Sequence, residues 1–355
     1  MSREEAKEVF TQILINEPTE MQQGAFLAAL KAKGETAEEI AGSWEAIYEL
    51  DTVKVTPCTP YPLVENCGTG MDTLKTFNIS TAASIIAAAA GITMAKHGAR
   101  AITSVCGTVD ILEAVGVDVD CDPQVVKTSI EEAGIGIFNG MSSKVHPQAL
   151  GRILSQIAFG TTLNIAASLA NPALPDYGVR GVYAKELVQP VARVMKEIGY
   201  KKAIVMHGLD KDGVYGMDEA STLGITIVAE LKENGDIENY YIGPEQLGIK
   251  PANRASLAPL NNIHEEALRF VGLLSGHQNG PCTDIICLNA ALILYLMDVC
   301  TSFAEGLDKS RQIIASGLAI KKLRDWISAQ KTEPEKGLAK LDSLLSKTTS
   351  QQYAI

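Results

Sequence analysis

Hydrophobic and polar residues repeat with helical spacing through the first 50 positions of the chain. Residues 4–15 form an amphipathic helical pattern. Thr19 and Thr36 each precede a further helical stretch, and Gln22 and Glu39 follow them by three residues, which is the spacing of an N-terminal capping box. Short connections join these stretches, so the pattern predicts a small helical subdomain.

The pattern changes at residues 56–62, where Pro57, Pro60 and Pro62 exclude a helix. We place the main domain boundary there, between a helical domain of residues 1–60 and an α/β domain of residues 61–355. Beyond it, short β-prone runs such as residues 63–66, 92–94 and 203–207 alternate with helical windows. This alternation predicts an α/β layer architecture.

Two later runs, residues 225–231 and 240–242, flank Asn234-Gly235 and predict an antiparallel pair, so we expect a mixed central sheet. The helical window 185–198 lies between two expected strands. Helices around residues 170–198 are therefore expected to return to the N-terminal helices and complete the helical domain.

Composition and charge exclude several classes of protein. The chain has 355 residues, of which 46% are hydrophobic and 21% charged, as in ordinary globular proteins. The net charge of -11 argues against binding to nucleic acid, although a local basic pocket remains possible. The longest apolar stretch, residues 82–95, is too short to cross a membrane and indicates a buried, alanine-rich helix. With no apolar leader and seven cysteines without a CxxC spacing, we expect a cytoplasmic protein with reduced thiols.

The densest group of candidate functional residues follows the first expected strand. Gly68-Thr69-Gly70 lets the backbone approach a ligand closely, and Asn78, Ser80 and Thr81 stand at a helix start, where free N–H groups favour an anion. The alternative is an ordinary strand–turn–helix with an Asn or Ser cap.

A second group extends from Lys96-His97-Gly98 to Asp110, with Lys96, Ser104 and Thr108 as phosphate-binding candidates. The alternative there is a solvated basic loop. A third group, Asp218-Glu219, is suited to Mg²⁺, whereas the alternative is an acidic first turn of a helix. Expected strands precede the first two groups, and α/β sheets bind ligands at such strand ends.

Together these motifs resemble the anthranilate phosphoribosyltransferase family of glycosyltransferase family 3, which is related to the pyrimidine-nucleoside phosphorylases. The resemblance covers most of the chain, up to about Leu323. The matching motifs are Gly68-Thr69-Gly70-x-Asp72, Thr76-Phe77-Asn78-Ile79-Ser80-Thr81, Lys96-His97-Gly98-x-Arg100, Gly107-Thr108-x-Asp110, Asn171-Pro172-Ala173, His207-Gly208 and Asp218-Glu219.

The resemblance implies an N-terminal helical domain that forms a homodimer, and a larger α/β domain that transfers 5-phosphoribose. The donor would be 5-phosphoribosyl 1-diphosphate (PRPP), the cofactor Mg²⁺, and the acceptor an aromatic amine such as anthranilate, as in tryptophan biosynthesis. By motif position, PRPP would be held by Gly68, Asp72, Thr76, Asn78, Ser80, Thr81, Lys96, Ser104 and Thr108. Mg²⁺ would be held by Ser80, Asp218 and Glu219, and the acceptor by Gly68, His97, Ala99 and Arg152. An amine nucleophile does not require a strong protein base, so no catalytic residue is assigned.

The chain departs from the family pattern at three places. Met71 stands where the family has a second glycine, and Ala99 stands where it has an asparagine that contacts the acceptor. The family's arginine for the acceptor carboxylate has no counterpart in register after His146-Pro147, and Arg152 is the candidate to replace it. We therefore expect a conserved donor half and an altered acceptor half.

Two alternative functions remain open from the sequence. Residues 100–110 are also similar to a loop of archaeal nucleoside-monophosphate phosphorylases, which cleave a nucleotide with inorganic phosphate. The second alternative is a non-enzymatic relative that binds a ligand or nucleic acid. The acidic pair and the whole-chain layout favour the transferase.

Overall fold

The computed structural model describes residues 1–101, 105–157, 159–330 and 333–352. Its first three helices are α1 (Arg3–Leu14), α2 (Glu20–Lys33) and α3 (Ala37–Leu50). Each begins at a capping box, and the two expected at Thr19 and Thr36 are confirmed; the third pairs Ser2 with Glu5. The prolines of residues 56–62 lie in a connection without helix or strand, as expected.

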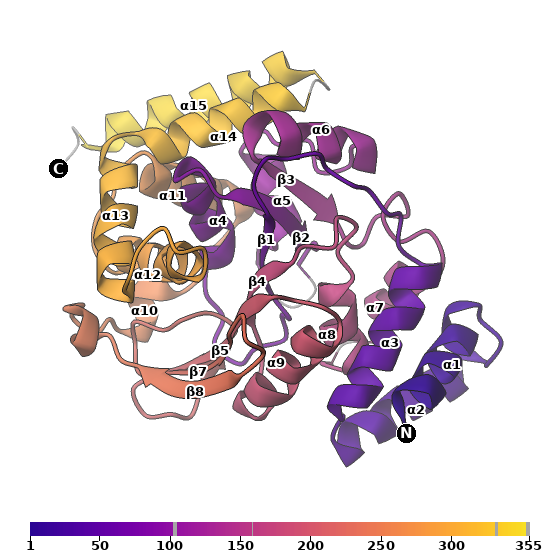
Figure 1. The fold of residues 1–355 in the computed structure, drawn as a ribbon. Coiled ribbons are helices and arrows are strands. Elements are labelled where there is room, and N and C mark those ends of the chain that lie inside the picture. The colour runs from indigo at the N-terminus through magenta and orange to yellow at the C-terminus, as the bar shows by residue number, and fades with distance from the viewer. Residues whose placement is uncertain (102–104, 158, 331–332, 353–355) are drawn as a thin grey trace.

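A central sheet forms the body of the larger part of the molecule (Figure 1). Its described strands are β1 (Leu63–Gly68), β2 (Thr93–Gly98), β3 (Ile135–Asn139), β4 (Tyr177–Gly181), β5 (Lys202–Leu209), β6 (Gly216–Met217), β7 (Thr226–Leu231) and β8 (Ile237–Ile242). The strand order is β3-β2-β1-β4-β5-β7-β8, and β6 pairs with β5. The pairs from β3 to β5 are parallel, and the pairs that involve β6, β7 and β8 are antiparallel. The expected mixed sheet and its antiparallel pair are therefore confirmed.

The structure corrects the expected boundary between the alanine-rich helix and the strand after it. Helix α4 (Ile79–Ala89) ends before Gly91, whose φ of 94° reverses the chain into β2. Strand β2 then continues through Gly98, because Lys96 and His97 pair with Ile137 and Phe138 of β3. Lys96 and His97 are thus strand residues, and the loop that follows starts at Ala99.

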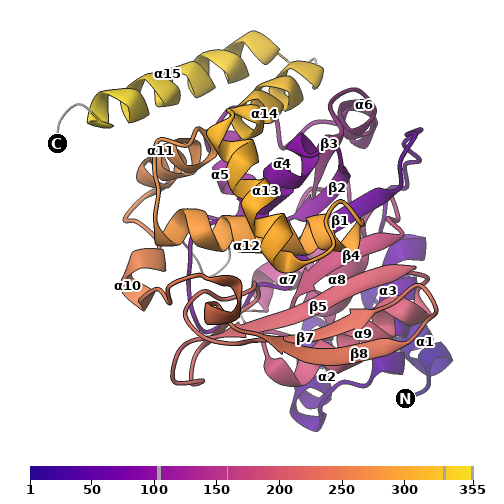
Figure 2. The same cartoon turned by 60° about the vertical axis from the view of Figure 1, so that its left-hand side comes forward.

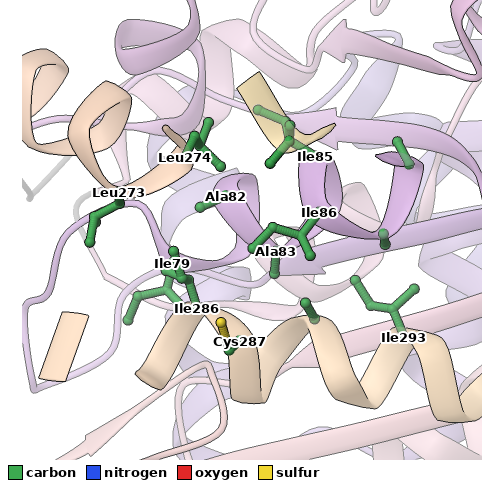
Figure 3. Close-up of a cluster of buried hydrophobic side chains, with 14 of the residues drawn as sticks. Ile79, Ala82, Ala83, Ile85, Ile86, Leu273, Leu274, Ile286, Cys287 and Ile293 are labelled. Atoms are coloured by element: carbon green, nitrogen blue, oxygen red, sulfur yellow. The ribbon is translucent and has the colours of Figure 1, made fainter. Parts of the chain in front are cut away.

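Helices α4, α11 (Ile263–Leu274) and α12 (Pro281–Leu296) cover one face of the sheet in a single hydrophobic cluster. Figure 3 shows Ile79, Ala83 and Ile86 of α4 meeting Ile286 and Cys287 of α12 in this cluster. Most of the apolar residues that other helices add to this cluster come from α5 (Thr108–Ala114), α13 (Phe303–Ala315), α14 (Leu318–Ala329) and α15 (Pro334–Gln352). This layer fixes the position of the α4 N-terminus relative to the end of β1.

Helices α7 (Leu150–Gln156), α8 (Thr162–Leu169) and α9 (Val188–Glu197) join the N-terminal helices in a second hydrophobic cluster. Helix α9 packs on α3 and also on β5 and β7, so it connects the helical part to the sheet. A 3₁₀ turn, η1 (Lys185–Leu187), leads into α9. The packing agrees with a return of the chain to the N-terminal helices, while the domain division at residue 60 stays a prediction.

The remaining described elements lie at the edges of the fold, and they are α6 (Pro123–Ala133), η2 (Glu245–Leu247) and α10 (Arg254–Leu257). The C-terminal helices α14 and α15 lie at the end of the molecule opposite α1 and α2 in both views (Figures 1 and 2). Among the described residues, we find no helix with the length and apolar content needed to cross a bilayer.

Candidate active site

A cavity of about 230 Å³ opens where the parallel strands β1, β2 and β3 end. Loops after these strands and residues of α4, α5, α7 and α8 line it. The lining comprises Cys67 to Asp72, Lys75 to Asn78, Ser80, His97 to Ala101, Cys106 to Thr108, Gly140, Met141, Leu154, Asn164, Ala167, Ser168, Asp218 and Glu219. Ligand binding at the carboxyl ends of parallel strands is the expected location for this fold class.

The first glycine loop leaves β1 with two successive residues in the left-handed region, Gly70 with a φ of 68° and Met71 with a φ of 66°. Glycine adopts this conformation freely, whereas a methionine there is strained by about 1–2 kcal/mol. Gly68 is required for a different reason, because a Cβ built on it would overlap the carboxylate of Asp218. The loop therefore brings backbone, rather than side chains, against the acidic residues.

The N-terminus of α4 faces the same cavity. Asn78 is its N-cap residue but makes no side-chain cap hydrogen bond; its Nδ2 instead donates to Cys106 O at 3.0 Å. This bond ties the helix start to the second glycine loop. Ser80 in the first turn lines the cavity. The Ile79 N–H donates to Phe77 O at 2.8 Å, and the absence of a side-chain cap leaves the next N–H groups of the first turn for an anionic ligand, as the dipole of an 11-residue helix favours.

Carboxylates hold the second glycine loop in shape. Asp110 Oδ2 accepts the N–H groups of Ala101 and Gly107, each at 2.9 Å, and its Oδ1 lies 3.0 Å from Arg100 Nη1. The Arg100 guanidinium also lies 2.8 Å from Glu113 and 3.5 Å from Asp120. These contacts tie the two described ends of the loop, at Arg100–Ala101 and at Gly107, to one carboxylate and to an ion-pair network.

Asp72, Asp218 and Glu219 form a compact acidic group in which one ligand atom from each lies within 4.8 Å of the others. Asp218 Oδ2 accepts the N–H of Gly70 at 2.7 Å, which anchors the acidic group to the first glycine loop. Burial raises the pKa of Asp72 to about 7, and the charge of Asp218 adds to the rise. Burial, followed by the charges of Asp218 and Asp72, raises the pKa of Glu219 well above its ordinary value.

This acidic group fits a hard divalent cation. Two buried carboxylates, Asp218 and Glu219, and the half-buried Asp72 repel one another, which is costly without a cation and is relieved by one. Asp218 and Glu219 follow β6 in an irregular segment, so the alternative of an acidic helix turn is wrong. Asp72, 146 residues earlier in the chain, completes the group.

A buried polar network lies behind the cavity lining. Glu65 on β1 accepts hydrogen bonds from Arg180 Nη2 at 2.6 Å, Tyr200 OH at 3.0 Å and Asn171 Nδ2 at 3.1 Å. Lys96 is buried nearby, and its Nζ donates to Asn66 O at 2.6 Å. Burial lowers the pKa of Lys96, although Cys67 and Glu65 favour its charged form.

His97 lines the cavity and faces a second histidine. Its Nε2 lies 3.2 Å from Nε2 of His146, whose Nδ1 contacts the carbonyl of Asp51. Burial, together with the charge of His146, lowers the pKa of His97 well below its ordinary value, and burial also lowers that of His146. The pair is therefore neutral near pH 7.

The structure brings most of the expected site residues together on the cavity wall, namely Gly68, Asp72, Thr76, Asn78, Ser80, His97, Ala99, Thr108, Asp218 and Glu219. Thr81 and Lys96 lie behind the lining, where Thr81 Oγ1 is 3.5 Å from Thr108 Oγ1. Ser104 lies outside the described residues. Arg152 is not on the wall; its guanidinium contacts Asn16, Glu20 and Gln23 of the N-terminal helices.

Helices α7 and α8 contribute residues that are not among the site residues expected from the sequence. Leu154 of α7 lines the cavity two positions after Arg152, and Asn164, Ala167 and Ser168 come from α8. Asn164 and Ser168 stand four residues apart on a helix whose other residues after Thr162 are apolar, and this spacing places both polar side chains on one face. Met141, just after β3, belongs to no such pattern.

The sequence matches the glycosyl transferase family in both of its domains, the helical bundle domain over residues 1–50 and the a/b domain over residues 60–320. Anthranilate phosphoribosyltransferase of Methanocorpusculum labreanum is 39% identical over 323 residues, which cover 91% of this chain and 92% of that protein. The enzyme of Anaeromyxobacter dehalogenans is also 39% identical, over 93% of this chain and 94% of that protein.

Solved structures agree with these sequence matches. The anthranilate phosphoribosyltransferase of Thermus thermophilus superposes with a TM-score of 0.83 at 32% identity, over 94% of this chain and 96% of that one. The enzyme of Saccharomyces cerevisiae in complex with PRPP and Mg superposes with a TM-score of 0.81 at 23% identity, over 93% of this chain and 94% of that one, and supports the fold. The chain therefore belongs to the anthranilate phosphoribosyltransferase family of glycosyltransferase family 3.

Proposed function

We propose that this protein is a Mg²⁺-dependent phosphoribosyltransferase that moves 5-phosphoribose from PRPP to an aromatic amine such as anthranilate and releases pyrophosphate. The observation that carries the proposal is the meeting, in one cavity, of two glycine loops, a helix N-terminus and three carboxylates. These are the groups that a metal-bound diphosphate requires. Relatives that bear the transferase name at 39% identity over almost the whole chain support the same activity.

The donor contacts follow from the position of each residue on the wall. Gly68 and Gly70 offer backbone to the diphosphate, and Asn78, Ser80 and Thr108 offer N–H and hydroxyl groups beside it. Lys96 and Thr81 would act from behind this wall, Lys96 by fixing the β1 backbone through Asn66 O. Ser104 is retained in the proposal from its motif position alone.

Asp72, Asp218 and Glu219 would hold Mg²⁺, with Ser80 meeting it directly or through the diphosphate. When bound, the cation would neutralise negative charge that grows on the leaving pyrophosphate. The amine nitrogen forms a bond to C1 of the ribose as the bond from C1 to the pyrophosphate oxygen breaks, and the nitrogen then loses a proton. The chain's own contribution is to align the two reactants and to place fixed N–H dipoles at the developing charge.

The acceptor would lie toward His97 and Ala99, and we propose that this part of the site is altered relative to the family. Ala99 has no polar side-chain group to offer an acceptor. Arg152 is excluded from the proposed site because its guanidinium is engaged with the N-terminal helices. Leu154 occupies the part of the wall that α7 supplies.

We also propose that the helical domain forms a homodimer. Met21 is 85% exposed and Ile15 is 54% exposed, so the surface of α1 and α2 carries large apolar side chains in the isolated chain. Light scattering coupled to size exclusion is expected to give the mass of two chains. Met21→Asp is expected to shift that mass toward one chain.

The activity is tested by pyrophosphate release from PRPP and Mg²⁺ with anthranilate and a panel of aromatic amines. Turnover that needs all three components and stops with a chelator is the expected result. Phosphate-dependent release of a base from a nucleoside monophosphate, with no reaction of PRPP, would instead establish the phosphorylase. Tight salt-sensitive binding to DNA or RNA without affinity for PRPP would establish a non-enzymatic relative.

A further inference from the structure

The cavity has two chemically different ends. The acidic end lies beyond β1 and contains Asp72, Asp218 and Glu219. The other end lies beyond β2 and β3 against α7 and α8, and we call it the neutral end. Its lining includes His97, Ala99, Met141, Leu154, Asn164 and Ser168. If the acidic end takes the diphosphate, the neutral end receives the acceptor.

Every cation on the described cavity wall already has a carboxylate partner. The wall contains two basic side chains, Lys75 and Arg100. Lys75 Nζ lies 3.2 Å from Asp72 at the acidic end, and the Arg100 guanidinium is shared by three carboxylates. In the sequence, positions 102–104 and 158 are Ile, Thr, Ser and Ala, and none of these residue types is charged.

The polar groups of the neutral end are hydrogen-bonding groups without charge. The close approach of the two imidazoles, 3.2 Å between their Nε2 atoms, disfavours charge on His97 and His146. Asn164 Oδ1 accepts the N–H of Thr161 at 2.9 Å, which orients the amide. Ser168 Oγ donates to Ile165 O at 2.7 Å and keeps its capacity to accept.

A carboxylate placed among such groups loses its hydration without gaining an ion pair, while an uncharged substituent of the same shape loses much less. Leu154 and Met141 add apolar surface that favours an aromatic ring. Resting on the proposed transferase activity, we infer that the acceptor is recognised as an uncharged aromatic amine and that a ring carboxylate contributes nothing to its binding. Amide-bearing and unsubstituted aromatic amines are the substrate class that fits.

The test compares anthranilate with 2-aminobenzamide, which has the same shape and an amide in place of the carboxylate. Pyrophosphate release gives kcat/KM for each with PRPP and Mg²⁺, and calorimetry gives the binding of each to protein that holds pyrophosphate and Mg²⁺. The amide is expected to equal or exceed anthranilate in both measurements. A tenfold or larger preference for anthranilate in either would overturn the inference.

Leu154 allows a matched gain of charge at the same wall. Leu154→Arg and Leu154→Lys are expected to shift the ratio of anthranilate to amide toward anthranilate by about 10- to 100-fold, the range of a charge-assisted hydrogen bond. Leu154→Met keeps size without charge and is expected to leave the ratio within about twofold of the parent. Equal ratios for the charged and uncharged variants, in chains that fold by circular dichroism, would contradict the assigned acceptor end.

Calorimetry separates failure of this inference from failure of the proposed function. If pyrophosphate is released with neither amine, the transferase proposal fails. The ratio of the two binding affinities then still tests whether the neutral end discriminates against a carboxylate. If pyrophosphate is released but anthranilate is strongly preferred, the transferase stands and the neutral acceptor is wrong. Absence of binding by both amines would also overturn the inference.

Discussion

Replacing Glu65 with glutamine would test whether the buried network behind the cavity depends on one carboxylate. Glu65 and Arg180 are both fully buried, and Glu65 accepts from Arg180, Tyr200 and Asn171. Glu65→Gln preserves the volume but leaves the guanidinium without a countercharge. Arg180 Nε and Nη1 have no hydrogen-bond partner among the described residues, and Glu65 is the carboxylate with which the guanidinium forms its ion pair.

Removal of one member of a buried ion pair costs about 3–5 kcal/mol. The unfolding entropy of about 2.1 cal/mol/K per residue gives about 0.75 kcal/mol/K for a chain of this length, so Tm is expected to fall by about 4–7 °C. Thermal unfolding followed by circular dichroism measures the shift. The matched control is Asp176→Asn, which removes the exposed partner of Lys201 and is expected to cost less than about 1 kcal/mol.

The double variant Glu65→Leu/Arg180→Met checks the cause of the loss. It removes both charges, so it is expected to be more stable than Glu65→Gln alone. If Glu65→Gln lowers Tm no more than the exposed control, the network does not depend on the Glu65 charge. The same conclusion follows if the double variant is less stable than the single one, because the loss would then come from shape rather than from an unpaired charge.

Four further predictions concern the acidic end and the β1 backbone. Gly68→Ala pushes the Asp218 carboxylate aside and is expected to lower PRPP-dependent turnover, measured by pyrophosphate release, by roughly 100-fold. The control Gly91→Ala lies at an open left-handed position away from the cavity. It is expected to lower stability by about 1 kcal/mol in thermal unfolding and to leave turnover unchanged. The pKa of Asp72 is raised from 3.8 to about 7, so Mg²⁺ must displace a proton from this carboxyl below that pH. Calorimetry is therefore expected to show tighter Mg²⁺ binding at pH 8 than at pH 6. Asp72→Asn is expected to make Mg²⁺ binding less dependent on pH. The same raised pKa makes the free energy of unfolding of the metal-free chain fall as pH rises from about 4 to about 7, which pH-dependent denaturation would detect. Lys96→Met leaves a buried β1 carbonyl without its donor and is expected to cost about 1–3 kcal/mol in urea unfolding; an unchanged midpoint would contradict the assigned bond.

Features set by neighbouring residues could be predicted from the sequence. The capping boxes at Thr19 and Thr36 depend on four consecutive residues, and both are present. The proline-rich connection and the helix start at Asn78 are likewise determined by residues close to them in the sequence. The two glycine loops can be predicted because glycine at a strand end indicates a tight turn or a close approach of the backbone to a ligand.

Features set by packing between distant segments could not be predicted in the same way. Strand β2 extends through Lys96 and His97 because β3 pairs with them, and β3 is almost 40 residues away. Asp72 joins the acidic group only because the first glycine loop folds over Asp218. The Arg152 guanidinium hydrogen-bonds to Asn16, which is more than 130 residues earlier in the chain. The residues next to Arg152 in the sequence give no sign of this contact.

The shared hydrophobic cluster of the N-terminal helices with α8 and α9 has a consequence for synthesis on the ribosome. The first three helices are complete after 50 residues, but α8 and α9 are complete only after residues 169 and 197. Helices α1 and α3 can pack on each other at once, but the apolar surface of α2 and α3 that α8 and α9 cover stays exposed while more than 100 further residues emerge. At about 5–20 residues per second this delay lasts on the order of 10 s, long enough for a nascent-chain chaperone to bind first.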